Sequence, residues 1–237
     1  MDNQNDLEGL LRSKDALEQL VTRHFKGQKV KKKLPKQLEN EFWHFNIDRT
    51  RSNAIQFFGQ GVITYSIYVL LILPTNYHII RDSEHFAMDF AFSILSLYLV
   101  GMALFLFWVF ARFRVWRAHF YKASCTIMFF TIVSVSLLLL SVSNLVLQNQ
   151  AMLFIAFLYM LGFVLSGIKP FHMLWVGGVA ALTVIISLYA LNIPCDLLIL
   201  ARMFIGSMLL GFSMSVMLNT KERKFFIKSK ISEIDEK

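Results

Sequence analysis

The chain has polar ends and a long apolar middle that is divided into runs of similar length. Residues 1–53 and 219–237 are rich in charged side chains, whereas residues 54–218 hold nearly all of the aromatic and aliphatic excess. An α-helix needs about 20 apolar residues to cross a hydrocarbon core roughly 30 Å thick. Six runs qualify: 54–73, 88–111, 123–147, 151–168, 173–191 and 197–218. The pattern therefore predicts an all-α, polytopic membrane helix bundle with six transmembrane helices.

Prolines and short polar segments mark the predicted ends of these runs. Pro74 is expected to end the first run, because proline lacks a backbone N–H and disfavours a helix interior. The Lys-Pro pair at 169–170 separates the fourth run from the fifth, and the segment 192–194 separates the fifth from the sixth. The third and fourth runs are parted only by the Gln-Asn-Gln segment 148–150, which predicts a tight polar turn.

The composition agrees with a membrane protein and excludes several other classes. Hydrophobic residues make up 56% of the 237 positions and charged residues 17%, against roughly 45–50% and about 25% in an average soluble domain. Such a chain is too apolar to be disordered. Its two cysteines and four prolines exclude a disulfide scaffold and a collagen-like fibre. Residues 1–15 lack the apolar core of a secretory signal peptide, so the first run is expected to stay in the membrane.

Lysine and arginine residues fall almost entirely on one side of the six predicted spans. Cytoplasmic segments of membrane proteins carry an excess of these residues. With the N-terminus in the cytoplasm, the segments 1–53, 112–122 and 219–237 together with Lys169 hold 22 of the 24 basic residues, and the opposite side holds only Arg81. The sequence therefore predicts a multi-pass protein with both termini in the cytoplasm.

The N-terminal segment 1–36 is predicted to be a cytoplasmic amphipathic helix followed by a basic linker. Apolar residues between positions 5 and 25 recur at spacings of three and four. Such a helix packs on the membrane, on a partner or on its copy in a dimer. The basic cluster that follows is attracted to anionic headgroups of the lipid bilayer, and nucleic acid is not an expected partner, because the positive-inside bias already explains the charge. The candidates for contact with the lipid surface are Lys29, Lys31, Lys32 and Lys33.

The six-span module is assigned to residues 37–218, and two helical segments are expected to extend from it into the cytoplasm. Residues 37–53 are predicted to begin one long helix that enters the first span. The tail 219–237 is predicted to form a short signalling helix, since its isoleucines follow the four-three spacing of a coiled-coil seam. A solvated tail is the alternative. The candidates for signal transmission are Glu222, Arg223, Ile227, Ile231 and Ile234.

Polar side chains within the apolar runs supply the candidates for a ligand site. Arg202 lies about a turn and a half inside the sixth run, where an arginine costs roughly 2.5–3.5 kcal/mol unless it reaches the interface. It either holds an anionic ligand or an acidic partner, or it extends towards the headgroups. The other polar candidates are Asp196, which is expected near the same interface, and Asn144 of the third run.

The sixth run also carries small residues at every fourth position. These are Ser207, Gly211 and Ser215. A stripe of small residues lets two helix backbones approach closely, either within the bundle or between two copies of the chain.

Catalytic and metal-binding patterns are not found in the sequence. The six histidines are scattered over both sides without metal-ligand spacing. Neither a phosphate-binding glycine loop nor a nucleophile elbow is present. Cys125 and Cys195 are expected on opposite membrane faces, so they do not form a disulfide. We therefore expect no catalytic residue, no metal and no cofactor.

The polar landmarks at both ends of the six-span module resemble those of a group of bacterial membrane proteins. They are Leu38-Glu39, Phe42-Trp43, Asp48-Arg49, Arg51, Gly61, Tyr65, Tyr68 and Leu73-Pro74 before and within the first span, and the Asn-Thr-Lys-Glu-Arg-Lys-Phe-Phe run 219–226 after the sixth. This order resembles the six-span N-terminal sensor modules of diguanylate cyclases (GGDEF proteins) and of some class III adenylate cyclases. The resemblance covers about residues 37–237.

The resemblance implies a signal-input module in the bacterial inner membrane. Such a module passes a stimulus to a cytoplasmic signalling domain or protein and works as a homodimer. The cyclase domain of that family would begin where this chain stops, and no GGDEF-like loop lies within the 237 residues, so the chain as given is not expected to be an enzyme. Two other functions are kept as alternatives: a small transporter or channel, and a membrane-bound protein that recruits a partner through the 5–25 helix.

Overall fold

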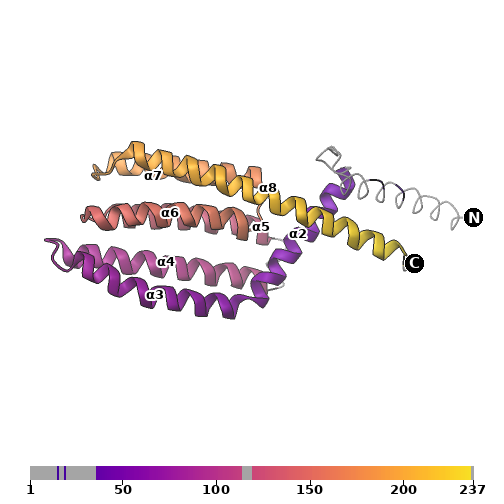
Figure 1. Cartoon of the computed structure of the whole chain (residues 1–237), viewed down its shortest axis with the longest axis horizontal. Coiled ribbons are helices and arrows are strands. Elements are labelled where there is room, and N and C mark those ends of the chain that lie inside the picture. Colours follow the sequence, from indigo (N-terminus) through magenta and orange to yellow (C-terminus); the bar gives the residue numbers. More distant parts are fainter. Residues whose placement is uncertain (1–14, 16–18, 20–35, 114–118, 236–237) are drawn as a thin grey trace, which may run out of the picture. The chain divides into compact units, whose positions relative to one another are not determined.

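The computed structural model describes residues 15, 19, 36–113 and 119–235. Within these residues it contains seven α-helices and no β-strand (Figure 1). The helices are α2 (Lys36–Gln56), α3 (Phe58–Ile80), α4 (Phe86–Arg112), α5 (Phe120–Leu140), α6 (Leu145–Leu165), α7 (Pro170–Ala190) and α8 (Leu197–Asp235).

Six of these helices, α3 to α8, are long and apolar enough to cross a membrane. The predicted all-α architecture with six spans is therefore confirmed, and the chain is a multi-pass membrane protein. Large apolar side chains are exposed on the outside of the helices, among them Leu70, Trp175 and Ile186, with exposed fractions of 70%, 75% and 64%. Lipid chains solvate such faces as well as another apolar side chain does.

The described chain separates into two compact units. One comprises residues 49–215 and is called the bundle here; the other comprises residues 1–48 and 216–237 and is called the terminal unit. Both α2 and α8 contribute residues to each unit, because the boundaries fall within these helices.

Within the bundle, α5 is the central helix and packs against α4, α6 and α7. The helices α3 to α7 and the first part of α8 run side by side in Figure 1. The main core joins α5, α6, α7 and α8, and its fully buried residues include Ile132, Tyr159, Ala180 and Phe204. The hydroxyl of Tyr159 donates to the carbonyl of Gly177 at 3.1 Å, so this large buried side chain leaves no unpaired polar group.

The prediction that Pro74 ends the first span is wrong, because α3 continues through this proline to Ile80. Proline removes one backbone donor, and membrane helices accommodate it when nearby hydroxyls bond to the backbone. The hydroxyl of the next residue, Thr75, donates to the carbonyl of Leu71 at 2.9 Å, four residues earlier in the same helix. The first span therefore lies later in the sequence than the predicted 54–73.

The predicted turn at 148–150 is also wrong, because these residues belong to α6. The turn between α5 and α6 lies at 141–144 instead, where the side chain of Asn144 accepts hydrogen bonds from the N–H groups of Val146 and Leu147 and so caps α6. Gln148 is buried and donates to the carbonyls of Leu140 and Pro194. The polar side chain of Gln148 therefore forms hydrogen bonds inside the bundle and does not mark a turn.

The cytoplasmic extensions also differ from the prediction in their bounds. α2 ends at Gln56 and α3 begins at Phe58, so the entry to the first span is two helices rather than one. At the other end, α8 is a single helix of 39 residues that includes both the sixth span and the described part of the tail. The predicted N-terminal helix at 5–25 and the lysines at positions 29 and 31–33 lie outside the described residues, except that Asp15 and Gln19 are helical and exposed.

Candidate functional site

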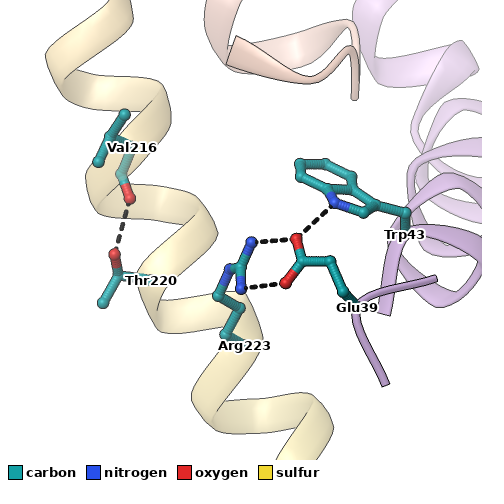
Figure 2. Close-up of polar contacts among 5 residues, drawn as sticks. All are labelled: Glu39, Trp43, Val216, Thr220 and Arg223. Atoms are coloured by element: carbon teal, nitrogen blue, oxygen red, sulfur yellow. Dashed lines mark hydrogen bonds and ion pairs between the residues drawn. The ribbon is translucent and has the colours of Figure 1, made fainter. Parts of the chain in front are cut away.

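A cluster of charged and aromatic side chains joins α2 to α8 within the terminal unit. We call it the α2–α8 cluster and define it by its central residues, which are Glu39, Phe42, Trp43, Arg223 and Phe226. Two of them, Glu39 and Arg223, are 184 positions apart in the sequence. Figure 2 shows the polar contacts, with Glu39 and Trp43 on one helix and Arg223 on the other.

The centre of the cluster is a bidentate ion pair. Arg223 Nη1 donates to Glu39 Oε2 at 2.6 Å, and Nη2 donates to Oε1 at 2.5 Å. The indole Nε1 of Trp43 donates to the same Oε1 at 2.8 Å. The planar guanidinium matches the carboxylate in this arrangement, so both the distance and the orientation of the two helices are specified.

The ion pair is shielded but still in contact with solvent. The side chains of Arg223 and Glu39 are 20% and 24% exposed. Hydrogen bonds to charged groups contribute about 1.5–3 kcal/mol when they are well formed. Partial exposure limits the cost of separating the two charges, because water solvates each of them once they part.

Aromatic side chains complete the cluster beneath the ion pair. Phe42 is fully buried and meets Phe226 edge-on, with ring centroids 5.8 Å apart. The guanidinium carbon of Arg223 lies 4.8 Å from the centroid of the Phe42 ring, a cation–π distance. The Phe45 ring lies 5.4 Å from that of Phe226. Such pairs add about 0.5–1.5 kcal/mol each beyond simple burial.

The residues predicted to transmit a signal occupy different positions in this unit. Arg223 forms the ion pair, and Ile227 is 7% exposed and so buried. Glu222 is half-buried on the same helix. Ile231 and Ile234 lie in α8, but their side chains are outside the described residues. Lys230 adds an exposed ion pair to Glu41 at 3.7 Å.

The small-residue stripe of α8 faces the interior of the same chain. Ser207 and Ser215 are each 4% exposed. A Cβ atom on Gly211 would lie 2.6 Å from Cδ2 of Phe163 on α6, so this glycine allows the two helices to approach closely. Of the two interpretations from the sequence, packing within the bundle accounts for the stripe.

The three polar candidates of the sequence are not brought together. Asn144 caps α6 and also donates to the carbonyl of Ile79 at 3.3 Å. Asp196 accepts from the N–H groups of Leu198 and Ile199 at 3.0 Å, which makes it the cap of α8. Arg202 is exposed and has no ion pair with any residue that the structure describes.

Sequence reasoning missed Asp89, the most deeply buried acidic side chain of the bundle. It is fully buried in the first turn of α4, where Oδ1 accepts from the backbone N–H of Ser143 at 2.9 Å and Oδ2 accepts from the hydroxyl of Ser83 at 3.1 Å. Asp89 thus ties the α3–α4 loop to the α5–α6 turn. Its position as the second residue of a predicted span was the available signal, since an acid in such a run needs partners.

Asp89 belongs to a wider set of buried and partly buried hydrogen bonds at one end of the bundle, which we call the polar network. Asn76 Nδ2 donates to the hydroxyl of Ser93 at 2.6 Å. Together with the bonds of Asn144 and Gln148 described above, these contacts connect the three loops at 81–85, 141–144 and 191–196. The polar network fixes this end of the bundle.

Among the described residues, no three His, Cys, Asp or Glu side chains are grouped to hold a metal ion. Both cysteines are free, in agreement with the expectation that they do not bridge each other. Comparisons of the chain with protein-family models, with curated proteins and with solved structures found no match.

Proposed function

We propose that the chain is a signal-input module of the bacterial inner membrane, in which the α2–α8 cluster passes a stimulus from the bundle to a cytoplasmic output such as a diguanylate cyclase. The observation that carries this proposal is the bidentate pair of Glu39 and Arg223, which joins the helix before the first span to the part of α8 that continues beyond the last span. Because of this ion pair, the position of the end of α8 depends on the position of α2.

The chemistry of the cluster suits a two-state element. A switch requires two arrangements that differ by only a few kcal/mol, so that a modest stimulus shifts their populations. The ion pair and its aromatic contacts supply a gain of that size, and solvation of the separated charges lowers the cost of the open arrangement. The continuity of α8 from Leu197 to Asp235 supports the proposal further, because a rotation or shift of a continuous helix is transmitted along its length.

Pairing of two copies is part of the proposal, because a cyclase output needs two catalytic domains. The stripe of Ser207, Gly211 and Ser215 is filled by the chain's own residues. We therefore assign the homodimer contact to the exposed face of α8 beyond residue 216 rather than to the stripe. The proposed module has both termini in the cytoplasm, as the distribution of basic residues predicts.

The transporter and channel alternative gains no specific support from the polar candidates. The side chains of Asn144 and Asp196 both accept hydrogen bonds from helix N-termini and act as helix caps. The recruiting alternative depends on the 5–25 helix, which lies outside the described residues.

A reporter chimera tests the proposal. A diguanylate cyclase catalytic domain without an input module is fused after Lys237, and cyclic di-GMP formation is measured in isolated membranes. Replacing Arg223 with alanine opens the α2–α8 cluster and is expected to change the activity at least about fivefold, which corresponds to roughly 1 kcal/mol. Lys221→Ala is the matched control, because Lys221 is an exposed basic residue of the same helix.

The result that supports the proposal is a change of activity in the Arg223 variant with equal amounts of protein in the membrane and no change in the Lys221 variant. Unchanged activity in both variants, at wild-type levels of insertion, overturns it. Flux of a solute through proteoliposomes of the wild-type chain that is lost in Arg202→Leu would favour the transporter instead.

A further inference from the structure

The loop between α6 and α7 contains a glycine with a left-handed backbone conformation. Gly167 has a φ of +65°, in the left-handed region that L-residues rarely adopt. A Cβ atom at this position would lie 2.5 Å from Oγ1, 2.8 Å from Cγ2 and 2.9 Å from Cβ of Thr50. The whole side chain of Thr50 on α2 therefore rests directly on the backbone of the loop.

The rest of this loop is anchored in the bundle. Ile168 is 2% exposed and belongs to the main core. The backbone N–H of Lys169 donates to the hydroxyl of Tyr121 on α5 at 3.3 Å, and the same hydroxyl lies 2.6 Å from Nδ1 of His172 on α7. A shift of α5, α6 or α7 is therefore expected to move the loop, whose backbone at Gly167 lies against the side chain of Thr50.

We propose that the α6–α7 loop, residues 166–169, is the joint through which a rearrangement of the bundle reaches α2. Resting on the function proposed above, this inference names the route by which the stimulus arrives at the α2–α8 cluster. Thr50 and Glu39 are both residues of α2, about three helical turns apart. A displacement of α2 at Thr50 therefore also displaces Glu39, whose carboxylate binds Arg223.

Substitution of Gly167 tests the joint in the full chain reconstituted in nanodiscs. The readout is the rate of tryptic cleavage after Lys224, which reports how often the terminal unit opens. Gly167→Ala places a methyl group against Thr50 and is expected to raise this rate at least about fivefold, while the melting temperature reports that the bundle is folded. Gly206→Ala is the control, because a Cβ atom on Gly206 meets nothing within 4 Å.

Two further variants separate contact from backbone strain. Asparagine tolerates the left-handed region better than alanine, so Gly167→Asn keeps the contact with Thr50 and relieves much of the strain. It is expected to raise cleavage as Gly167→Ala does. The double variant Gly167→Ala/Thr50→Ala removes Oγ1 and Cγ2, two of the three close atoms, and is expected to return the rate at least halfway to the wild-type value.

Cleavage within about twofold of wild type in both Gly167 variants, with the bundle folded, overturns the joint. If neither variant inserts, Thr50→Ala alone decides, because it adds no atoms: an unchanged cleavage rate overturns the joint and an increase of about threefold supports it. These outcomes are distinct from a failure of the proposed function, which is judged by cyclic di-GMP formation in the Arg223 variant.

Discussion

The polar network and the α2–α8 cluster both connect segments that are distant in the sequence, but they use different chemistry. In the polar network, side chains such as Asp89 and Gln148 are bonded mostly to backbone groups and are almost fully buried. In the α2–α8 cluster, two charged side chains bond to each other and remain 20% and 24% exposed. Breaking the first kind of contact leaves polar groups stranded in an apolar interior, whereas breaking the second returns them to water.

This difference assigns unequal costs of opening to the two regions. A buried donor or acceptor that loses its partner costs about 1–3 kcal/mol. A partly exposed ion pair loses less, since solvent replaces the partner. The bundle end with the polar network is therefore expected to stay fixed, and the terminal unit is expected to be the region that changes.

The largest effect is expected from Asp89→Ala. It removes the buried carboxylate and leaves the N–H of Ser143 and the hydroxyl of Ser83, both only partly shielded, without this partner, which costs about 2 kcal/mol of folding free energy. The melting temperature of the purified protein measures the loss. Asp82→Ala serves as the control, because the Asp82 side chain is 87% exposed and pairs only loosely with Arg81. Equal melting temperatures of the Asp89 variant and wild type would show that the polar network does not hold the bundle.

A smaller effect is expected from the ion pair of the terminal unit. Glu39→Ala and Arg223→Ala are each expected to raise tryptic cleavage after Lys224 about tenfold, which corresponds to roughly 1.4 kcal/mol. The double variant is expected to resemble either single variant, because both remove the same interaction. Additive effects of the two substitutions would mean that Glu39 and Arg223 act independently.

Lys230→Ala is expected to have a still smaller effect. The ion pair of Lys230 with Glu41 is 3.7 Å long and lies between side chains that are 34% and 54% exposed. Such surface pairs contribute about 0–1 kcal/mol, so cleavage after Lys224 changes less than about threefold. An effect as large as that of Arg223→Ala would place the stabilising contact at the rim of the terminal unit rather than at its centre.

Cys195 tests the orientation of the bundle without any substitution. It lies in the α7–α8 loop, and burial, followed by the negative charge of Asp196, raises the pKa of its thiol above the ordinary value of 9.0. Because the thiolate is the reactive form, labelling by a membrane-impermeant maleimide is slow at neutral pH and rises about tenfold per pH unit below that pKa. Intact cells are expected to be labelled from outside. Labelling only after permeabilisation would reverse the assigned orientation.

Much of the bundle follows from hydropathy alone, and the corrections have local causes. All six spans were recognisable because apolar runs of about 20 residues have few other uses. The bounds failed at Pro74, where Thr75 bonds to the backbone and the helix continues, and at Gln148, whose amide finds buried carbonyls. The amide of Gln148 is satisfied by partners that only the fold supplies, whereas Pro74 is accommodated within α3 itself.

The candidate site was predictable only in its parts. Glu39 stood out within the landmarks before the first span, and Arg223 among the residues after the last. Nothing in the sequence joins them, because 184 positions separate the two. The position of Gly167 against Thr50 could not be predicted either, since the two residues lie on different elements far apart in the sequence.

Hydrogen exchange in nanodiscs measures the contrast between the two regions directly. Amides of α8 between residues 217 and 228 are expected to exchange at least about tenfold faster than amides of α5 between residues 130 and 138. Arg223→Ala is expected to accelerate the first set and leave the second unchanged. Equal exchange in the two sets, or equal acceleration of both by Arg223→Ala, would contradict a bundle core that opens less readily than the terminal unit.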